Sequence, residues 1–258
     1  MNKSLTALLS EIVDYAGLFP PSEVSMQVAV QNFNSYIRGE HAWMLGRFVV
    51  PVGRLEEFSE CSKKYLDGKN LWRLSALPQE DLAASMAAIS EFNEKNAGRA
   101  VIDTVEVKVS ESREITATGK ILPTGVIAFY EIPATEILTD FITALALTRQ
   151  RAKIRTGGIT PGAFPSTDAG IKFMRICIAA NVPFKATAGL HHPLRCQKPL
   201  TYEPNAPTGT MHGFLNLFLA ACLLRHDLNH PLVHRLMNES DDAAFQFDDD
   251  AIRWAGHE

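Results

Sequence analysis

Two lysines stand inside strand-like segments of this sequence, where apolar side chains are expected. Lys153 lies in RAKIRTG, which begins at 151, and Lys185 lies in VPFKATAG, which begins at 182. Each lysine has an apolar neighbour on both sides. Because side chains alternate along a strand, those neighbours face one side of the sheet and the lysines face the other. The same alternation puts Arg155 on the face of Lys153 and Thr187 on the face of Lys185.

Acidic side chains follow a similar pattern in earlier segments. Glu106 lies in AVIDTVEVKV, which begins at 100, and Glu131 lies near the end of GVIAFYEIP, which begins at 125. Asp14 lies in EIVDYAG, close to the N-terminus. If these segments are strands of one sheet, their carboxylates meet the two lysines at its carboxyl edge.

This combination of residue types suits catalysis through a lysine imine. Crowded ammonium groups repel one another and lose hydration, and both effects favour a neutral, nucleophilic amine. A carboxylate nearby balances the charge and transfers protons. We therefore expect Lys153 to attack a carbonyl group, Lys185 to lower the pKa of Lys153, and Glu106 to relay protons. The structural alternative is that these residues form salt bridges in the upper layer of a barrel.

The segments that carry these residues recur with the period of an α/β barrel. Six strand-like segments start 25 to 31 residues apart, with amphipathic helical patterns between them. This arrangement indicates parallel βαβ units. EIVDYAG at 11–17 supplies another strand, and AAFQF at 243–247, followed by a helical DDDAIRW, supplies the last. The sequence thus predicts a single (β/α)8 TIM barrel domain over residues 1–258, with an extended loop and helical insert near 191–242 that forms a lid or an extra layer.

Short motifs in the middle of the chain resemble those of the class I deoxyribose-phosphate aldolase family. KIRTG at 153–157 is similar to the family's Lys-x-x-Thr-Gly at its Schiff-base lysine. FKATAG at 184–189 is similar to its Phe-Lys-x-x-x-Gly at a second lysine. DTVE at 103–106 is similar to its Asp-x-Val-Asp, with Glu in the last place, and Glu131 matches a glutamate that ends the next strand. The resemblance spans about a third of the chain and implies a divergent carbon–carbon lyase on a barrel fold.

The family binds its substrate phosphate at two turns that differ in this chain. GLHH at 189–192 follows the second lysine, and three aspartates at 248–250 replace a Gly-Ser-rich turn. Each carboxylate would repel a nearby phosphate charge by about 1 kcal/mol at ~4 Å in water. We therefore expect uncharged or monocarboxylate carbonyl compounds rather than sugar phosphates. Gly189 is expected to let the backbone approach a ligand. The expected substrate-binding residues are Arg155, Thr187, Glu131, His191, His192, Arg195 and Asp14.

Two other functions remain open at this level. A metal-assisted lyase or isomerase would use His191 and His192 as ligands, with His212 as a further candidate and a lysine as base. These histidines have no fixed ligand spacing, so we assign no metal residues. A non-catalytic barrel would instead bind a small anionic metabolite through the positive charges of Lys153, Arg155 and Lys185. No nucleotide-binding loop is present, and we expect no cofactor.

Composition narrows the choice of partners. The chain has 258 residues, 46% of them hydrophobic, and a net charge of −4 with both signs mixed, so nothing indicates binding to nucleic acid. The longest apolar run, at 214–224, is too short to cross a bilayer, and acidic residues appear too early for a signal peptide. Four cysteines without a paired motif indicate reduced thiols. We expect a cytoplasmic protein that acts on a small molecule; the sequence leaves its oligomeric state open, a homo-oligomer included.

Overall fold

The computed structural model describes residues 2–133 and 138–257. At its centre is a sheet of seven parallel strands that follow one another in sequence order. The strands are β1 (Val13–Tyr15), β2 (Leu45–Pro51), β3 (Trp72–Leu77), β4 (Ala100–Lys108), β5 (Ile127–Glu131), β6 (Arg151–Arg155) and β7 (Phe184–Thr187). The parallel βα repeat that the sequence predicts is therefore confirmed.

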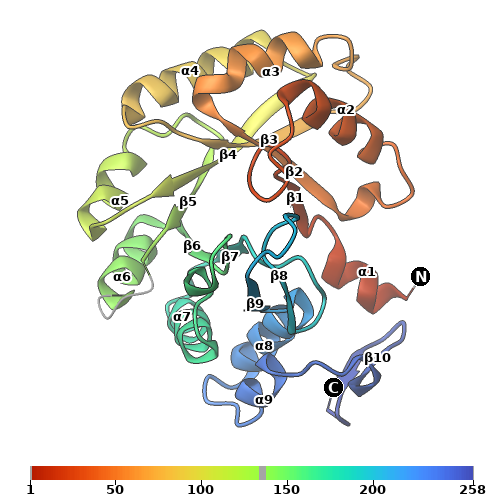
Figure 1. The fold of residues 1–258 in the computed structure, drawn as a ribbon. Coiled ribbons are helices and arrows are strands. Elements are labelled where there is room, and N and C mark those ends of the chain that lie inside the picture. Colours follow the sequence, from red (N-terminus) through yellow and green to blue (C-terminus); the bar gives the residue numbers. More distant parts are fainter. Residues whose placement is uncertain (1, 134–137, 258) are drawn as a thin grey trace.

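Helices alternate with these strands. They are α1 (Lys3–Leu9), α2 (Met26–Tyr36), α3 (Leu55–Ser62), α4 (Leu82–Lys95), α5 (Ser112–Gly119), α6 (Leu138–Thr148) and α7 (Thr167–Ala179). Short 3-10 helices lie at Ala42–Met44, Val52–Arg54, Pro161–Ala163 and Asp242–Ala244. Figure 1 shows the sheet curled into a half-barrel, with α2 to α7 arranged along its outer side.

Side-chain caps define the starts of three of these helices. The side chains of Ser25, Asp81 and Ser166 each accept a hydrogen bond from a backbone N–H in the first turn of α2, α4 and α7. Such caps satisfy donors that would otherwise lack a partner at a helix start. Each capped helix then buries an apolar face, and Met86, Ile89 and Phe92 of α4 are examples.

The hydrophobic core lies between the sheet and these outer helices. Phe33 of α2 packs edge-to-face against Trp72 of β3 and Phe48 of β2, with ring centroids 4.9 and 5.4 Å apart. Phe58 of α3 continues the group, 5.2 Å from Phe48. Buried aromatic residues of this size contribute much of the apolar area that stabilises a fold. The outer face of the sheet is thus filled with apolar side chains, which leaves the inner face for polar ones.

The sheet is open, and the predicted closure by an eighth parallel strand is wrong for the described residues. Of the segment 243–247, Phe245–Phe247 forms β10, which pairs antiparallel with β11 (Ile252–Trp254) in a separate two-stranded sheet. The DDDAIRW segment is therefore a turn and a strand, and the predicted helix is absent. Asp248 Oδ1 accepts the N–H groups of Asp250 and Ala251 at 2.9 and 2.8 Å, and these bonds stabilise the turn. The hairpin pairs with itself, so β1 and β7 remain the edges of the main sheet.

The insert at 191–242 forms an additional layer beside α7. It contains an antiparallel hairpin of β8 (Cys196–Pro199) and β9 (Thr208–Met211), followed by α8 (Phe214–His226) and α9 (Val233–Met237). Both helices pack against α7. Asn216 of α8 is fully buried and donates to the carbonyl groups of Leu236 and Glu239 at 2.7 and 3.0 Å. Of the two predicted arrangements, the extra layer is the one observed (Figure 1).

Candidate functional site

Lys153 is buried on the inner face of the half-barrel between two carboxylates. Its Nζ lies 2.7 Å from Glu106 Oε2 and 2.6 Å from Glu131 Oε2. Glu131 is its register partner on the neighbouring strand β5, and Glu106 comes from β4. Only 5% of Lys153 is exposed. Burial of a charged amine is tolerated here because two carboxylates replace the lost water.

Glu106 joins the two lysines. Its second oxygen, Oε1, accepts hydrogen bonds from Lys185 Nζ at 2.7 Å and from Ser75 Oγ at 2.9 Å. Burial by itself would raise the pKa of Glu106, but the ammonium groups of Lys185 and Lys153 outweigh it and lower the pKa from 4.5 to about 2. Glu106 is therefore ionised at neutral pH and is fully occupied by donors from three strands.

Lys185 connects the two edges of the open sheet. Its Nζ lies 2.8 Å from Asp14 Oδ2 on β1, in addition to its bond to Glu106. It also lies 5.1 Å from the ring centre of Phe129, a favourable position for a cation. Burial disfavours the charged form, but Asp14 and Glu106 outweigh it and raise the pKa of Lys185 above 10.5. We call Asp14, Glu106, Glu131, Lys153 and Lys185 the lysine–carboxylate cluster.

The electrostatics of this cluster differ from the sequence-based expectation. The two lysines are register partners on β6 and β7, as expected. However, three carboxylates lie among them, so the five groups carry a formal charge of −1 when all are ionised. Lys185 is thus held in its charged form by ion pairs, and lysine crowding does not determine its charge. The sequence predicted the members of the cluster, whereas their pairing depends on how strongly the sheet curls.

Ser75 belongs to the site, although it is not among the site residues expected from the sequence. It lies on β3, is fully buried and donates to Glu106. Its neighbour Thr104 on β4 is also buried on the inner side. The strands β3 and β4 shift register between Leu74 and Ser75, where the pairing passes from Ile102 to Thr104 and leaves Asp103 as an extra residue. The bulge interrupts the alternation on β4, so Asp103 and Glu106 share the inner face although they are three positions apart.

A second ionic group lies on the same inner face, nearer the start of the strands. Asp103 accepts from Arg47 Nε and Arg73 Nε at 2.6 and 2.9 Å, and Arg73 also pairs with Glu11 at 2.8 Å. Burial favours the neutral carboxyl, but the bonds from the two guanidinium groups hold the pKa of Asp103 below its usual value. Asp14 links the two groups, since its Oδ1 accepts the backbone N–H of Arg47 at 2.8 Å.

The predicted substrate-binding residues divide into two sets. Arg155 lies at the exposed end of β6 beside its register partner Thr187, and its Nε donates to the carbonyl of Gly157 at 3.2 Å. These two residues stand directly above the lysine–carboxylate cluster, because each is two positions beyond a lysine on the same strand. Asp14 and Glu131 are members of the cluster itself.

Arg195, in contrast, is directed toward the insert. Its NH1 lies 3.3 Å from Thr167 Oγ1 and 3.5 Å from His212 Nδ1. His212 Nε2 lies 2.7 Å from the carbonyl of Pro165, which can only accept, so the ring is protonated at Nε2. Burial lowers the pKa of His212, and this favours the neutral ring. The described contacts of Arg195 therefore serve loop packing, and its predicted role as a substrate grip is not supported by them.

The glycine after β7 lies where the loops after β6 and β7 meet. Gly189 has a φ of +74°, and a Cβ atom built on it would lie 2.7 Å from Gly157 Cα and 2.8 Å from Phe164 Cε1. Thr156 Oγ1 donates to the carbonyl of Ala188 at 2.6 Å and joins the same two loops. Gly189 is thus required for the close approach of the loops after β6 and β7, and the backbone space there is occupied by protein.

The acidic turn at 248–250 lies in the β10–β11 hairpin and contacts the start of α1. Asp249 Oδ1 accepts the backbone N–H of Lys3 at 3.0 Å, and Asp248 pairs with Arg253. The turn therefore does not follow a barrel strand as predicted, and the argument that it repels a substrate phosphate loses its structural basis.

His191 is exposed and His192 is half-buried in the loop after β7. Among the residues that the structure describes, no group of three or more His, Cys, Asp or Glu side chains is placed to hold a metal ion. Over the same residues, no helix has the length and apolar character needed to cross a membrane.

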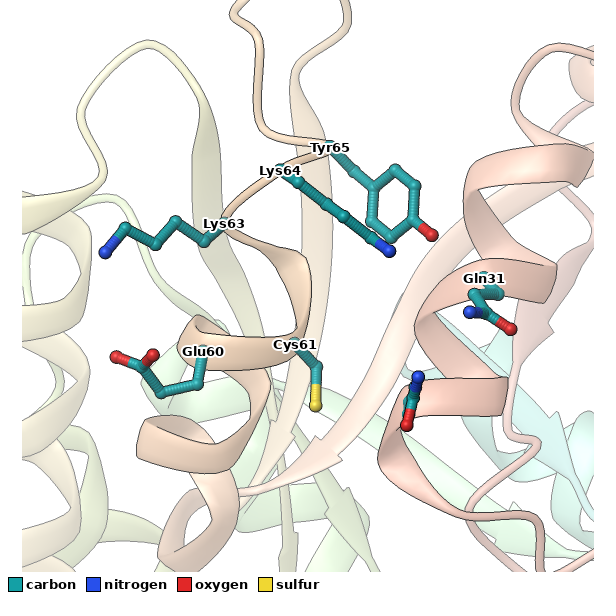
Figure 2. A pocket seen from close by; sticks show the side chains of 7 residues that line it. Gln31, Glu60, Cys61, Lys63, Lys64 and Tyr65 are labelled. Carbon is teal, nitrogen blue, oxygen red and sulfur yellow. The ribbon is translucent and has the colours of Figure 1, made fainter.

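A groove of about 380 Å³ lies on the outer helices, between α2 and α3. Figure 2 shows side chains that line it, and they are Gln27, Gln31, Glu60, Cys61, Lys63, Lys64 and Tyr65. None of them belongs to the lysine–carboxylate cluster. The groove is therefore separate from the candidate site on the inner face.

Comparison of the chain with protein-family models, with curated proteins and with solved structures gives no match. The structure itself shows a barrel-like parallel α/β fold, and two lysines and three carboxylates form ion pairs on its inner face.

Proposed function

We propose that this chain is a carbon–carbon lyase of the aldolase type, which acts on a small carbonyl compound through an imine on Lys153. The observation that carries the proposal is the position of Lys153: it is buried on β6, two residues before the strand's carboxyl end, with two carboxylates within 2.7 Å and a second lysine as its register partner. Barrel enzymes place their reacting groups at this end of the strands.

The ion pairs of Lys153 define the proton transfer with which the reaction must begin. Lys153 must lose a proton before it attacks, and Glu131 Oε2 at 2.6 Å is close enough to accept it. Glu106, whose pKa of about 2 makes it a weak base, stays ionised and stabilises the positive charge of an iminium ion. Condensation of the amine with the carbonyl releases one water molecule and gives a protonated imine. The bond between Cα and the hydroxyl-bearing Cβ then breaks: the β-hydroxyl loses its proton and leaves as a carbonyl product, and the electron pair moves toward the imine nitrogen to give an enamine. Protonation of Cα and addition of water then release the second carbonyl product and regenerate the amine of Lys153.

The short motifs support the same assignment. KIRTG at 153–157 and FKATAG at 184–189 resemble the two lysine motifs of class I deoxyribose-phosphate aldolases, and both lie at the ends of adjacent parallel strands. The chain would be a divergent member of that family, because its sheet is open and its loop after β7 differs. Each motif is short, so the contacts of Lys153 carry more weight than the motifs.

Two alternatives have less support. A non-catalytic anion site made of Lys153, Arg155 and Lys185 would need unneutralised charge on the lysines as well, but Asp14, Glu106 and Glu131 already pair with both of them. A metal-assisted reaction at His191 and His192 would need contacts between these histidines and the acid–base groups, and the described residues provide none.

Borohydride trapping tests the proposal. The protein is incubated with a panel of small aldehydes and oxo acids, reduced, digested and mapped by mass spectrometry. We expect a reduced adduct on Lys153 with at least one compound, its loss in Lys153→Ala, and its retention in Lys172→Ala, which removes an exposed lysine of α7. Absence of any adduct on Lys153 over the whole panel would contradict the imine mechanism.

A further inference from the structure

Two exposed cations stand immediately above the lysine–carboxylate cluster, on the strands that flank β5. Lys108 is the last residue of β4 and Arg155 the last residue of β6. Each lies two positions beyond an inward-facing member of the cluster, Glu106 on β4 and Lys153 on β6, so both point to the inner side of the sheet. Lys108 is also the register partner of Glu131.

Neither cation is neutralised within the described part of the chain. Glu131 pairs with its other register partner, Lys153, and the Lys108 side chain has no ion pair or hydrogen bond among the described residues. Over the same described residues, the Arg155 side chain donates only to the neutral carbonyl of Gly157. This differs from the rest of the inner face, where Arg47, Arg73 and Lys185 all have carboxylate partners.

We infer that Lys108 and Arg155 bind an oxyanion group of the substrate, so that the substrate class is small carbonyl compounds that carry a carboxylate or a phosphate. This inference rests on the proposed function for the carbonyl part, and on the two cations for the acidic part. An anion bound between Lys108 and Arg155 lies two residues, or about 7 Å along the strand, beyond Lys153. A carbonyl carbon at Lys153 and an acid group a few bonds away match that spacing.

The local charge favours this arrangement. The five groups of the cluster have a formal charge of −1, and the two cations bring the total to +1, so one substrate anion neutralises the site. A guanidinium group also binds carboxylates and phosphates through two parallel hydrogen bonds. Specificity would thus be set by β4 and β6, and by neither the loop at 189–192 nor Arg195.

Matched pairs of carbonyl compounds test the inference. The compounds are 4-oxopentanoate against its methyl ester, pyruvate against its amide, and glyceraldehyde 3-phosphate against glyceraldehyde. The concentration that gives half-maximal borohydride trapping on Lys153 is measured for each, and binding without reductant is measured by calorimetry. We expect at least one acidic member to reach half-maximal trapping at about tenfold lower concentration than its neutral partner. The three pairs distinguish carboxylate from phosphate.

Variants locate the effect. Lys108→Ala and Arg155→Ala should each raise the half-maximal concentration of the preferred acid about tenfold and leave its neutral partner unchanged within twofold. Lys108→Arg should restore the preference, and Lys120→Ala, which removes an exposed lysine after α5, should have no effect. Equal concentrations for acid and neutral partner, or an acid preference that survives both alanine variants, would overturn the inference while leaving the imine mechanism intact. If no compound is trapped but calorimetry shows acid binding that depends on Lys108 and Arg155, the imine mechanism fails and the anion site stands.

Discussion

Lys185 Nζ and Asp14 Oδ2 lie 2.8 Å apart and join the two edge strands of the open sheet, β7 and β1. The residues are 171 positions apart in sequence, at the last and first strands of the half-barrel. In a closed barrel an eighth strand would separate them. Here an ion pair replaces the backbone hydrogen bonds that such a strand would make, and it draws the open edges together at the level of the candidate site.

Asp14→Asn should therefore weaken the fold more than loss of an exposed carboxylate does. The substitution keeps an oxygen that accepts the backbone N–H of Arg47, but it removes one of the two negative charges that pair with Lys185. We therefore expect a loss of about 1–3 kcal/mol in unfolding free energy. Urea denaturation measures it. The matched control is Glu11→Gln, whose carboxylate is mostly exposed in its pair with Arg73 and should contribute less than about 1 kcal/mol. Equal losses in the two variants would show that the bridge between β1 and β7 adds no stability.

Glu106→Gln should be the most destabilising charge removal in the cluster. It leaves Lys153 buried with one carboxylate and Lys185 with one, so we expect a loss of about 3–5 kcal/mol. Glu57→Gln removes a carboxylate that also pairs with a cation, Arg54, but does so at the surface, where the expected loss is below about 1 kcal/mol. A loss for Glu106→Gln as small as that for Glu57→Gln would mean that water enters the cluster.

The unfolding free energy should depend on Glu106 at acid pH and on Lys185 at alkaline pH. The pKa of Glu106 is lowered, so its contribution is present above pH 4.5 and is lost as the pH falls from there toward about 2. This contribution amounts to about 3 kcal/mol, at about 1.4 kcal/mol per pKa unit. The pKa of Lys185 is raised, so its contribution is complete below pH 10.5 and is lost as the pH rises through its folded value.

Denaturation with urea at a series of pH values measures both effects. We expect an acid slope that is reduced in Glu106→Gln, since the variant has no carboxyl group to protonate at that position. An unchanged acid slope in the variant would assign the acid sensitivity to other carboxylates, such as Asp103, whose pKa is also lowered.

Gly189→Ala should destabilise the loops beside the site through a steric clash as well as backbone strain. The new Cβ would meet Gly157 Cα at 2.7 Å, in addition to the cost of a φ of +74°. Gly98→Ala provides the control, because Gly98 has a φ of +75° but no atom within 4 Å of the added Cβ. We expect about 1 kcal/mol for Gly98→Ala and at least about 2 kcal/mol for Gly189→Ala, measured as unfolding free energies. If both variants lose the same amount, the loop after β7 can move away from Gly157.

Local sequence patterns determined much of this fold. The alternation around Lys153 and Lys185 correctly put both lysines on the inner face, since side chains on a strand must alternate whatever the strand pairs with. The Ser166 cap and the apolar face of α7 depend only on residues in or next to that helix, so a local pattern is enough to specify them. The order of the parallel strands follows from the spacing of these elements, which leaves room for one helix between neighbours.

Tertiary structure decided what these side chains meet. Whether 243–247 joined the main sheet depended on its competition with Ile252–Trp254, only a turn away, and the closer pairing prevailed because a short loop costs less entropy to close. The partner of Lys185 depended on the curl of the whole sheet, which brings Asp14 within 2.8 Å across an open edge. Likewise, the bulge at Asp103 sets the register in which Ser75 pairs with Thr104, and in that register Ser75 donates to Glu106. Contacts of this kind join residues that are distant in the chain, and a local period carries no information about them.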